Sequence, residues 1–165
     1  MADTFTAAVK LQTSVQQTFD TAAGPAAGTP KVTHSNWDFS HSLSATSTPP
    51  FSKHACEQKA LAAGAGSIDL TSLTGFNGEA VDGTGLKVQV LKLRNPSTNG
   101  NSISIAPGTA NPYDLMGTDS KLTLEPGDEV ILFMYDTAPD IDATNKIFDL
   151  AGTGTQALDV EILMG

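Results

Sequence analysis

Alternating apolar and polar residues mark several segments of this chain as β-strands. The clearest is KLTLEPGDEVILFMYD, residues 121–136, in which Leu122 and Leu124 alternate with polar residues and residues 130–135 form a continuous apolar run. Period-two alternation indicates a strand with one buried face, and a short apolar run indicates a strand covered on both faces. The intervening EPGD is typical of a tight turn, because proline and glycine suit its two central positions. We therefore expect a hairpin whose second strand is central in the core.

The N-terminal third shows the same alternation over two longer stretches. Residues 5–19 carry apolar side chains at odd positions, although Leu11, Val15 and Phe19 also stand four apart, as they would in a helix. Sustained alternation and frequent threonine favour a strand. Residues 31–45 repeat the pattern with a polar opposite face that could meet water or another subunit. The apolar positions that we assign to packing between subunits are Phe5, Val9, Leu11, Val15, Phe19, Trp37 and Phe39.

Shorter strands follow along the rest of the chain. Residues 53–63 are ambiguous between a short helix and an edge strand, and we favour the strand. In residues 86–95 the alternation changes phase near Val90, which indicates a bulge or a strand covered on both sides. The sequence NPSTNGN at 95–101 is typical of a hairpin loop. Leu73 and Phe76 are expected to fill the core from a loop. Further strands are predicted at residues 67–70, 103–105, 147–150 and 158–162.

These elements predict an all-β fold. Roughly eight or nine short strands without alternating helices are typical of an antiparallel β-sandwich, here jelly-roll-like with extended N-terminal strands. We divide the chain into N-terminal strands at residues 1–63 and a sandwich core at residues 64–165, the two expected to form one compact unit.

Composition and charge narrow the functional classes. The 165 residues include 18 acidic and 9 basic side chains, a formal charge of −9 that would repel nucleic acid and anionic lipid. Cys56 is the only cysteine, so no disulfide can form within the chain, which favours a reducing compartment. No apolar run approaches the ~20 residues that cross a bilayer. We expect a soluble protein, made in a cytoplasm, with neither nucleic acid nor membrane as a partner.

Two groups of side chains are candidates for metal binding. Asp136, Asp140 and Asp142 place three carboxylates in one loop, as calcium prefers, but they lack the order of an EF-hand; the alternative is a solvated acidic loop. His54 and Cys56 would share one face of a strand, yet two ligands do not make a zinc site. An ordinary surface histidine beside a small thiol is the simpler interpretation. No cofactor is expected, with calcium as the one candidate.

Catalytic signatures are missing from the sequence. It contains no nucleophile elbow, no phosphate-binding Walker loop and no dinucleotide-binding glycine pattern. The three aspartates could be proposed as a pair for glycoside hydrolysis, but nothing places two carboxyls on opposite sides of a sugar. We therefore expect that the protein is not an enzyme.

The C-terminal part resembles a known class of proteins. The run GLKVQVLKLRNPSTNGNSISIAPGTANPYDLMGTDSKLTLEPGDEVILFMYD, with the final GTGTQALDVEILMG, is similar to virion structural proteins of tailed bacteriophages and related prophages. The resemblance covers residues 67–165 and lies in the pattern of strands and turns; the first 63 residues match nothing comparable. It implies a capsid decoration, or cement, protein that forms a homo-oligomer, with a trimer expected, and binds the major capsid protein. Such a protein is made in the bacterial host cytoplasm and lies on the capsid surface of the virion.

Two alternatives remain open. A small tail, fibre or baseplate component would share the same strand pattern and differ mainly in symmetry. A carbohydrate-binding β-sandwich would instead use an exposed aromatic side chain, such as Trp37 or Phe39, together with calcium near Asp136, Asp140 and Asp142. An aromatic pair at strand spacing more often belongs to a core.

Overall fold

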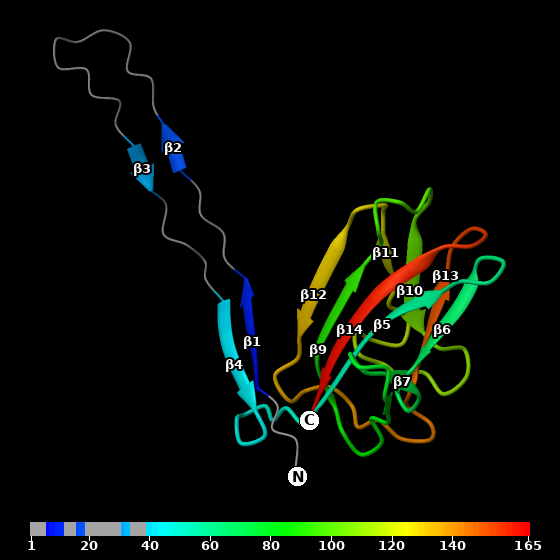
Figure 1. Cartoon of the computed structure of the whole chain (residues 1–165), viewed down its shortest axis with the longest axis horizontal. Coiled ribbons are helices and arrows are strands. Elements are labelled where there is room, and N and C mark those ends of the chain that lie inside the picture. The colour runs from blue at the N-terminus through cyan, green and yellow to red at the C-terminus, as the bar shows by residue number, and fades with distance from the viewer. Residues whose placement is uncertain (1–5, 12–15, 19–30, 34–38) are drawn as a thin grey trace, which may run out of the picture.

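The described part of the chain is built from β-strands. The structure, a computed structural model, describes residues 6–11, 16–18, 31–33 and 39–165 (Figure 1). Within these residues there is no helix, and hence none long and apolar enough to span a bilayer. The predicted all-β class is confirmed.

Two four-stranded antiparallel sheets pack face to face as a sandwich. One sheet, here called the arm-side sheet, has the order β12 (Glu129–Phe133), β9 (Val88–Arg94), β14 (Ala157–Met164) and β5 (Lys53–Ala60). The other has the order β11 (Leu122–Leu124), β10 (Ile103–Pro107), β13 (Ile147–Ala151) and β6 (Ala65–Asp69). The predicted antiparallel sandwich is confirmed.

The strand pairs of the sandwich are nested. Its first strand pairs with its last, β5 with β14, and the pairs β6 with β13, β9 with β12 and β10 with β11 follow inward. Successive strands therefore lie in opposite sheets, except for β10 and β11. A long hairpin folded over in this way is the arrangement found in jelly rolls.

The core between the sheets follows from the alternation of side chains. In β14 the side chains of Leu158, Val160 and Ile162 are buried, as the sequence predicts. In β9 the register slips beside Gln89, because Leu163 pairs with Val90 while the next residue, Met164, pairs with Val88. The expected change of phase is therefore a bulge, and the strand is also covered on both sides, since Val90 belongs to a second apolar cluster outside the sandwich.

The predicted hairpin at residues 121–136 is wrong in its pairing. The turn forms as expected, with the Asp128 amide bonded to the Glu125 carbonyl and Gly127 at a φ of 95°. However, β11 and β12 lie in different sheets, and β12 is an edge strand on which Ile131 remains 40% exposed. The backbone of Asn95 bonds to the turn from the end of β9, so the turn forms a corner between the sheets.

Two other local predictions also need correction. The loop at residues 95–101 is not a hairpin loop, because β9 and β10 lie in different sheets. Phe76 does not fill the core: it is 78% exposed, whereas Leu73 is buried. Phe76 lies between β7 (Leu73–Thr74) and β8 (Ala80–Val81), a short antiparallel pair whose turn holds it in solvent.

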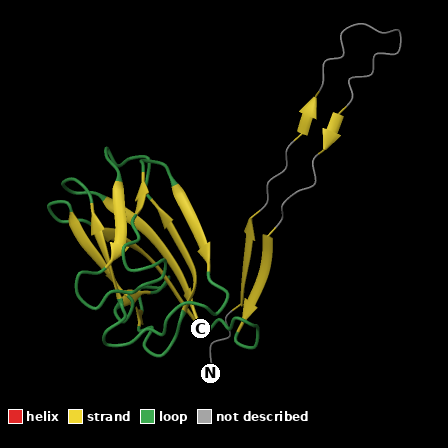
Figure 2. Ribbon diagram, turned by 180° about the vertical axis from the view of Figure 1, so that it is seen from behind, coloured by secondary structure: helices red, strands yellow, loops and turns green. Residues whose placement is uncertain are grey.

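The N-terminal strands form ladders of their own. β1 (Thr6–Leu11) pairs with β4 (Phe39–Ser44), and β2 (Gln16–Thr18) pairs with β3 (Lys31–Thr33). These strands confirm the predicted strand type wherever the two long stretches are described. Figure 2 shows the ladders as an arm beside the sandwich. The edge strand expected at residues 53–63 is β5; it lies within the range 1–63 of the predicted N-terminal part, yet it pairs with β14 in the sandwich.

Candidate interaction surface

The outward side chains of the arm-side sheet lie in three rows. Pairing registers fix the rows, since residues opposite one another in adjacent strands point to the same side. The first row is Phe133, Val90, Leu163 and His54; the second is Ile131, Lys92, Glu161 and Cys56; the third is Glu129, Arg94, Asp159 and Gln58. The face therefore changes from mainly apolar to charged along its strands.

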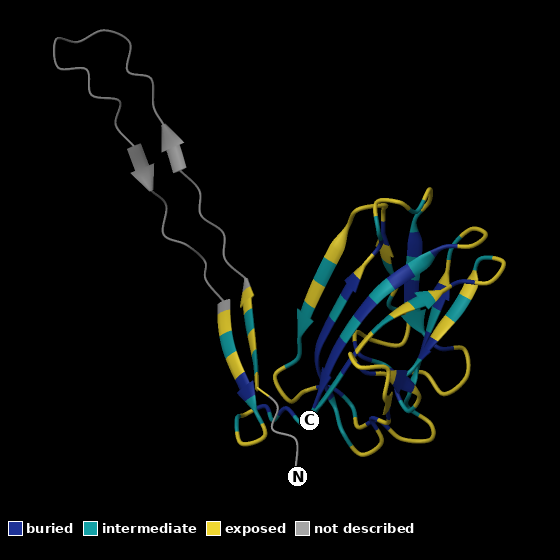
Figure 3. Cartoon of the chain, in the orientation of Figure 1, coloured by how far each residue is buried: buried dark blue, intermediate teal, exposed yellow. Residues whose placement is uncertain are grey.

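The apolar row is where the N-terminal arm meets the sandwich. Buried Leu43 and Phe51 pack against Val90 and Leu163, with Ala7, Val9 and Phe133 around them; these seven residues are here called the docking cluster. The His41 ring also stacks on Phe133, with 4.3 Å between ring centroids. Figure 3 shows exposed and less exposed positions alternating along β4, with a buried one toward the end that approaches the sandwich. Side-chain packing thus holds the β1–β4 hairpin, called the arm hairpin below, on the sheet.

Alternation in β1 explains which side of the arm hairpin docks. Ala7 and Val9 are half-buried toward the sandwich, whereas Thr6, Ala8 and Lys10 are exposed. A groove of about 390 Å³ remains between β1 and the arm-side sheet, with Ile131, Lys92 and Glu161 among its lining residues. The candidate surface is therefore the contact between the arm hairpin and the arm-side sheet, which leaves a groove beside β1.

Polar contacts neutralise much of the second and third rows. The Glu161 carboxylate lies between His54 and Lys92, with a hydrogen bond to His54 Nε2 at 3.3 Å and an ion pair to Lys92 Nζ at 3.8 Å. Gln58 donates a 2.8 Å hydrogen bond to Asp159. Burial, together with Glu161 and Asp159, raises the pKa of the Cys56 thiol. Cys56 therefore stays protonated at neutral pH, which is the opposite of what a nucleophilic cysteine needs.

Histidine and cysteine do not form a zinc site in this surface. His54 and Cys56 point outward from the same strand, as predicted, but they belong to different rows and His54 bonds to Glu161. The described residues contain no group of three or more His, Cys, Asp or Glu side chains placed to hold a metal ion.

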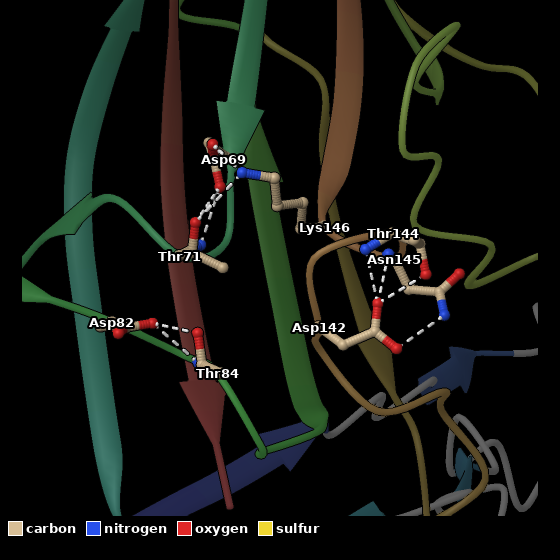
Figure 4. Close-up of polar contacts among 8 residues, drawn as sticks. All are labelled: Asp69, Thr71, Asp82, Thr84, Asp142, Thr144, Asn145 and Lys146. Carbon is tan, nitrogen blue, oxygen red and sulfur yellow. Dashed lines mark hydrogen bonds and ion pairs between the residues drawn. The ribbon is translucent and has the colours of Figure 1, made fainter.

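Three aspartates outside this face share one local motif. In each, the carboxylate accepts hydrogen bonds from the amide and hydroxyl of the threonine two residues later, at 2.6–2.9 Å: Asp69 with Thr71, Asp82 with Thr84 and Asp142 with Thr144 (Figure 4). For Asp82 and Asp142 these hydrogen bonds lower the pKa of the carboxyl. The motif stabilises loops, as expected for Asx turns.

Lys146 adds a charge partner to one of these aspartates. Its Nζ lies 3.0 Å from an Asp69 carboxylate oxygen, which ties β6 to the start of β13. Burial by itself would raise the pKa of Asp69, but the hydrogen bonds from Thr71 and Lys146 lower it overall.

The three aspartates proposed as calcium ligands each make contacts with different partners. Two amides and the Thr144 hydroxyl donate to one oxygen of the Asp142 carboxylate, Oδ1. Asp136 lies 3.3 Å from the Lys87 ammonium group, and Asp140 makes a backbone bridge with Lys87. Asp136, Asp140 and Asp142 do not come together as one cation-binding group.

The structure describes only some of the residues that the sequence assigns to subunit packing. Val9 packs at the docking cluster. Leu11 and Phe39 are paired across the β1–β4 ladder by their backbones. Phe5, Val15, Phe19 and Trp37 lie outside the described residues.

Sequence reasoning missed several members of the docking cluster. Phe51 follows two prolines and does not belong to an alternating run, so only its large apolar side chain hinted at burial. Val90 and Leu163 look like ordinary core positions in their strands. The pairing of β9 with β14 is needed to show that both point outward.

Known proteins do not extend these observations. No protein-family model, no curated protein and no solved structure matches this chain.

Proposed function

We propose that the chain is a capsid decoration protein of a tailed-phage virion, which forms a homo-oligomer and binds the major capsid protein. The observation that carries this proposal is the arm hairpin. It forms a two-stranded sheet of its own, pairs with no described strand of the sandwich, and is held on the arm-side sheet by the small docking cluster. An isolated two-stranded ladder is marginally stable in water, so strands that extend from a domain gain stability from a partner surface.

The charge and the nested sandwich are compatible with this role. A formal charge of −9 favours solubility of the free protein and disfavours nucleic acid as a partner. Arms that pack against neighbouring copies around a symmetry axis would combine weak contacts into firm attachment without catalytic chemistry. A trimer is the expected assembly, with the arm hairpins in the contacts between copies.

Cosedimentation with undecorated phage heads tests the proposal. The purified protein is expected to pellet with heads, and light scattering before mixing should give a mass that is a multiple of three chains. A monomer that stays in the supernatant would contradict both parts of the proposal.

A matched pair of variants tests the role of the arm hairpin. Leu43→Asp places a charge in the docking cluster, where Leu43 is 2% exposed, and should displace the arm hairpin and weaken pelleting. Ser42→Asp adds the same charge at the neighbouring exposed position of β4 and should leave pelleting unchanged. Equal binding by both variants would show that the docked arm is not needed. Circular dichroism checks that the sandwich remains folded in each.

A further inference from the structure

The four edges of the sandwich differ in how they are protected. Exposed edge strands invite pairing with other chains, and proteins usually guard them with charges, prolines, short length or a covering element. β11 has only three residues, and Pro126 follows it closely. β6 carries a glycine and a serine in its five residues. β5 carries Lys53 and Lys59 and is contacted by β7 and β8.

β12 is guarded only at its two ends, by the charge of Glu129 at its first residue and by the arm hairpin, whose His41 ring stacks on Phe133 at its last residue. Its five residues, EVILF, contain no lysine, proline or glycine, and its single charge is at its first residue. Among the described strands it pairs with β9 alone. Ile131 at its centre is 40% exposed and Tyr135 just beyond it is 55% exposed, two of the four large exposed apolar side chains in the described residues. Figure 3 shows exposed positions along β12. This edge has the composition of a strand that pairs further.

We propose that β12 pairs antiparallel with β12 of a second copy, around a two-fold axis at Ile131. In this register Ile131 faces its counterpart, Val130 faces Leu132, and Glu129 faces Phe133. Opposed residues share a face of the sheet, and the observed burial agrees: Val130 and Leu132 pack toward the main core, whereas Glu129 and Ile131 point outward. The pairing joins the two arm-side sheets into one continuous sheet.

The distribution of charge along β12 supports a second copy of the chain as the partner that pairs with this edge. Glu129, the only charged residue of β12, meets an apolar residue of the partner and not its own counterpart, so no like charges are opposed within the paired segment. The other three edges fit less well, because β5 carries two lysines and is contacted by β7 and β8, β11 has three residues, and β6 contains a glycine, a serine and an aspartate. A two-fold contact of this kind is also closed, so it does not propagate into fibres.

This contact goes beyond the proposed decoration role. It uses the backbone edge of β12 and not the strands of the arm hairpin, although the Ile131 side chain also lines the groove beside β1, and it needs no capsid protein. If the protein pairs through β12 but does not bind phage heads, only the decoration role is contradicted. If it binds heads but does not pair through β12, only this inference is contradicted.

Two variants of the full-length protein test the pairing by mass. Ile131→Lys places a charge on the axis and should halve the mass measured by light scattering. Thr123→Lys makes a similar change at an exposed position of the edge strand β11 and should leave the mass unchanged. Equal masses for wild type and both variants would overturn the proposal. Circular dichroism confirms that each variant is folded.

Cysteine cross-linking tests the register. In a Cys56→Ser background, which removes the only native thiol, Ile131→Cys should form a disulfide-linked dimer under mild oxidation, because directly opposed residues of antiparallel strands lie within disulfide range. Thr123→Cys in the same background is the control and should remain mainly uncross-linked. Cross-linking no greater than in this control would overturn the two-fold pairing, even if Ile131→Lys lowers the mass.

Discussion

The ring of His41 in β4 stacks on the ring of Phe133 in β12, with planes 16° apart, and so connects the arm hairpin to an edge strand of the sandwich. Aromatic pairs contribute about 0.5–1.5 kcal/mol beyond their buried area. Phe133→Ala should therefore loosen the arm hairpin and raise the rate of tryptic cleavage at exposed Lys10 by roughly 2- to 10-fold. Tyr135→Ala, which removes an aromatic ring that is 55% exposed, is the control. An unchanged cleavage rate in Phe133→Ala would show that this stack does not hold the arm.

Asn95 connects the end of β9 to the neighbouring corners. Its side-chain amide donates to the carbonyls of Leu124 and Asn101, at 2.8 and 3.2 Å, and its carbonyl oxygen accepts from Asn99. Asn95 is fully buried, so Asn95→Ala would leave buried polar groups without partners and should lower the free energy of unfolding by about 2–3 kcal/mol. Urea unfolding measures this change.

The control for Asn95 is its acceptor, Asn101. The exposed residue Asn101 takes part through its backbone carbonyl, so Asn101→Ala keeps the hydrogen bond and should change the free energy of unfolding by less than about 0.5 kcal/mol. Equal losses in both variants would argue that the side chain of Asn95 is not the source of the stability.

Asn95 also explains why the hairpin prediction was wrong. The sequence correctly indicates strands on both sides of the EPGD turn, because alternation and turn residues act locally. Which strands pair is decided by distant residues: the Asn95 amide donates to the Asp128 carbonyl, and the Asn95 carbonyl accepts from the Gly127 amide. These bonds from β9 hold the turn as a corner. Strand type was therefore predictable, whereas sheet membership was not.

The same reason limits prediction of the interaction surface. Val9 was identified from alternation, and it does pack at the docking cluster. Val90 and Leu163 were not separable from the main core by sequence, because both belong to strands with buried residues on two sides. The outward direction of Val90 depends on the bulge beside Gln89, where an extra residue reverses the side on which the following residues of β9 point. Leu163 points outward because it lies between the inward residues Ile162 and Met164 of β14.

Stability at low pH should depend on Asp142. Its hydrogen bonds with Thr144 and Asn145 lower its pKa in the folded state, so its contribution is present above the ordinary aspartate pKa and is lost as pH falls below about 4. Asp142→Asn removes the titrating group, and the difference in melting temperature between wild type and variant should shrink between about pH 5 and pH 2. Asp119→Asn, a change in another exposed loop, is the control. A difference independent of pH would contradict the assignment.

Calcium should not stabilise the folded protein through the aspartate loop. Asp142 Oδ1 already accepts from two amides and a hydroxyl, Asp136 pairs with Lys87, and the described residues hold no group of three or more candidate ligands for a cation. The expected melting temperature is the same with millimolar calcium and with chelator. A bound ion at 100 times its dissociation constant would add about 2.7 kcal/mol, which is readily measured. A rise that Asp142→Asn abolishes would restore the calcium site and, with it, the carbohydrate-binding alternative.

Stability at high pH should depend on Tyr113. Its side chain is fully buried, its hydroxyl donates a 2.7 Å hydrogen bond to the Pro139 carbonyl, and the Val88 amide donates to the same hydroxyl at 3.1 Å. Burial raises the pKa of Tyr113 from 10.0 to about 12. The folded state therefore holds this proton more tightly than the unfolded state. The resulting stability is complete below about pH 10 and is lost as pH rises toward 12.

Tyr113→Phe separates this effect from the titration of other groups. The ring can keep its edge-to-face contact with Phe148, but the Val88 amide and Pro139 carbonyl lose their partner, which should lower the free energy of unfolding by about 1–3 kcal/mol at pH 7. Because the variant cannot ionise at this position, the gap from wild type should narrow as pH rises above 10. Tyr135→Phe, at an exposed position, should change neither the free energy of unfolding at pH 7 nor its dependence on pH above 10. A constant gap between pH 8 and pH 11 would show that the buried hydroxyl does not carry the high-pH loss of stability.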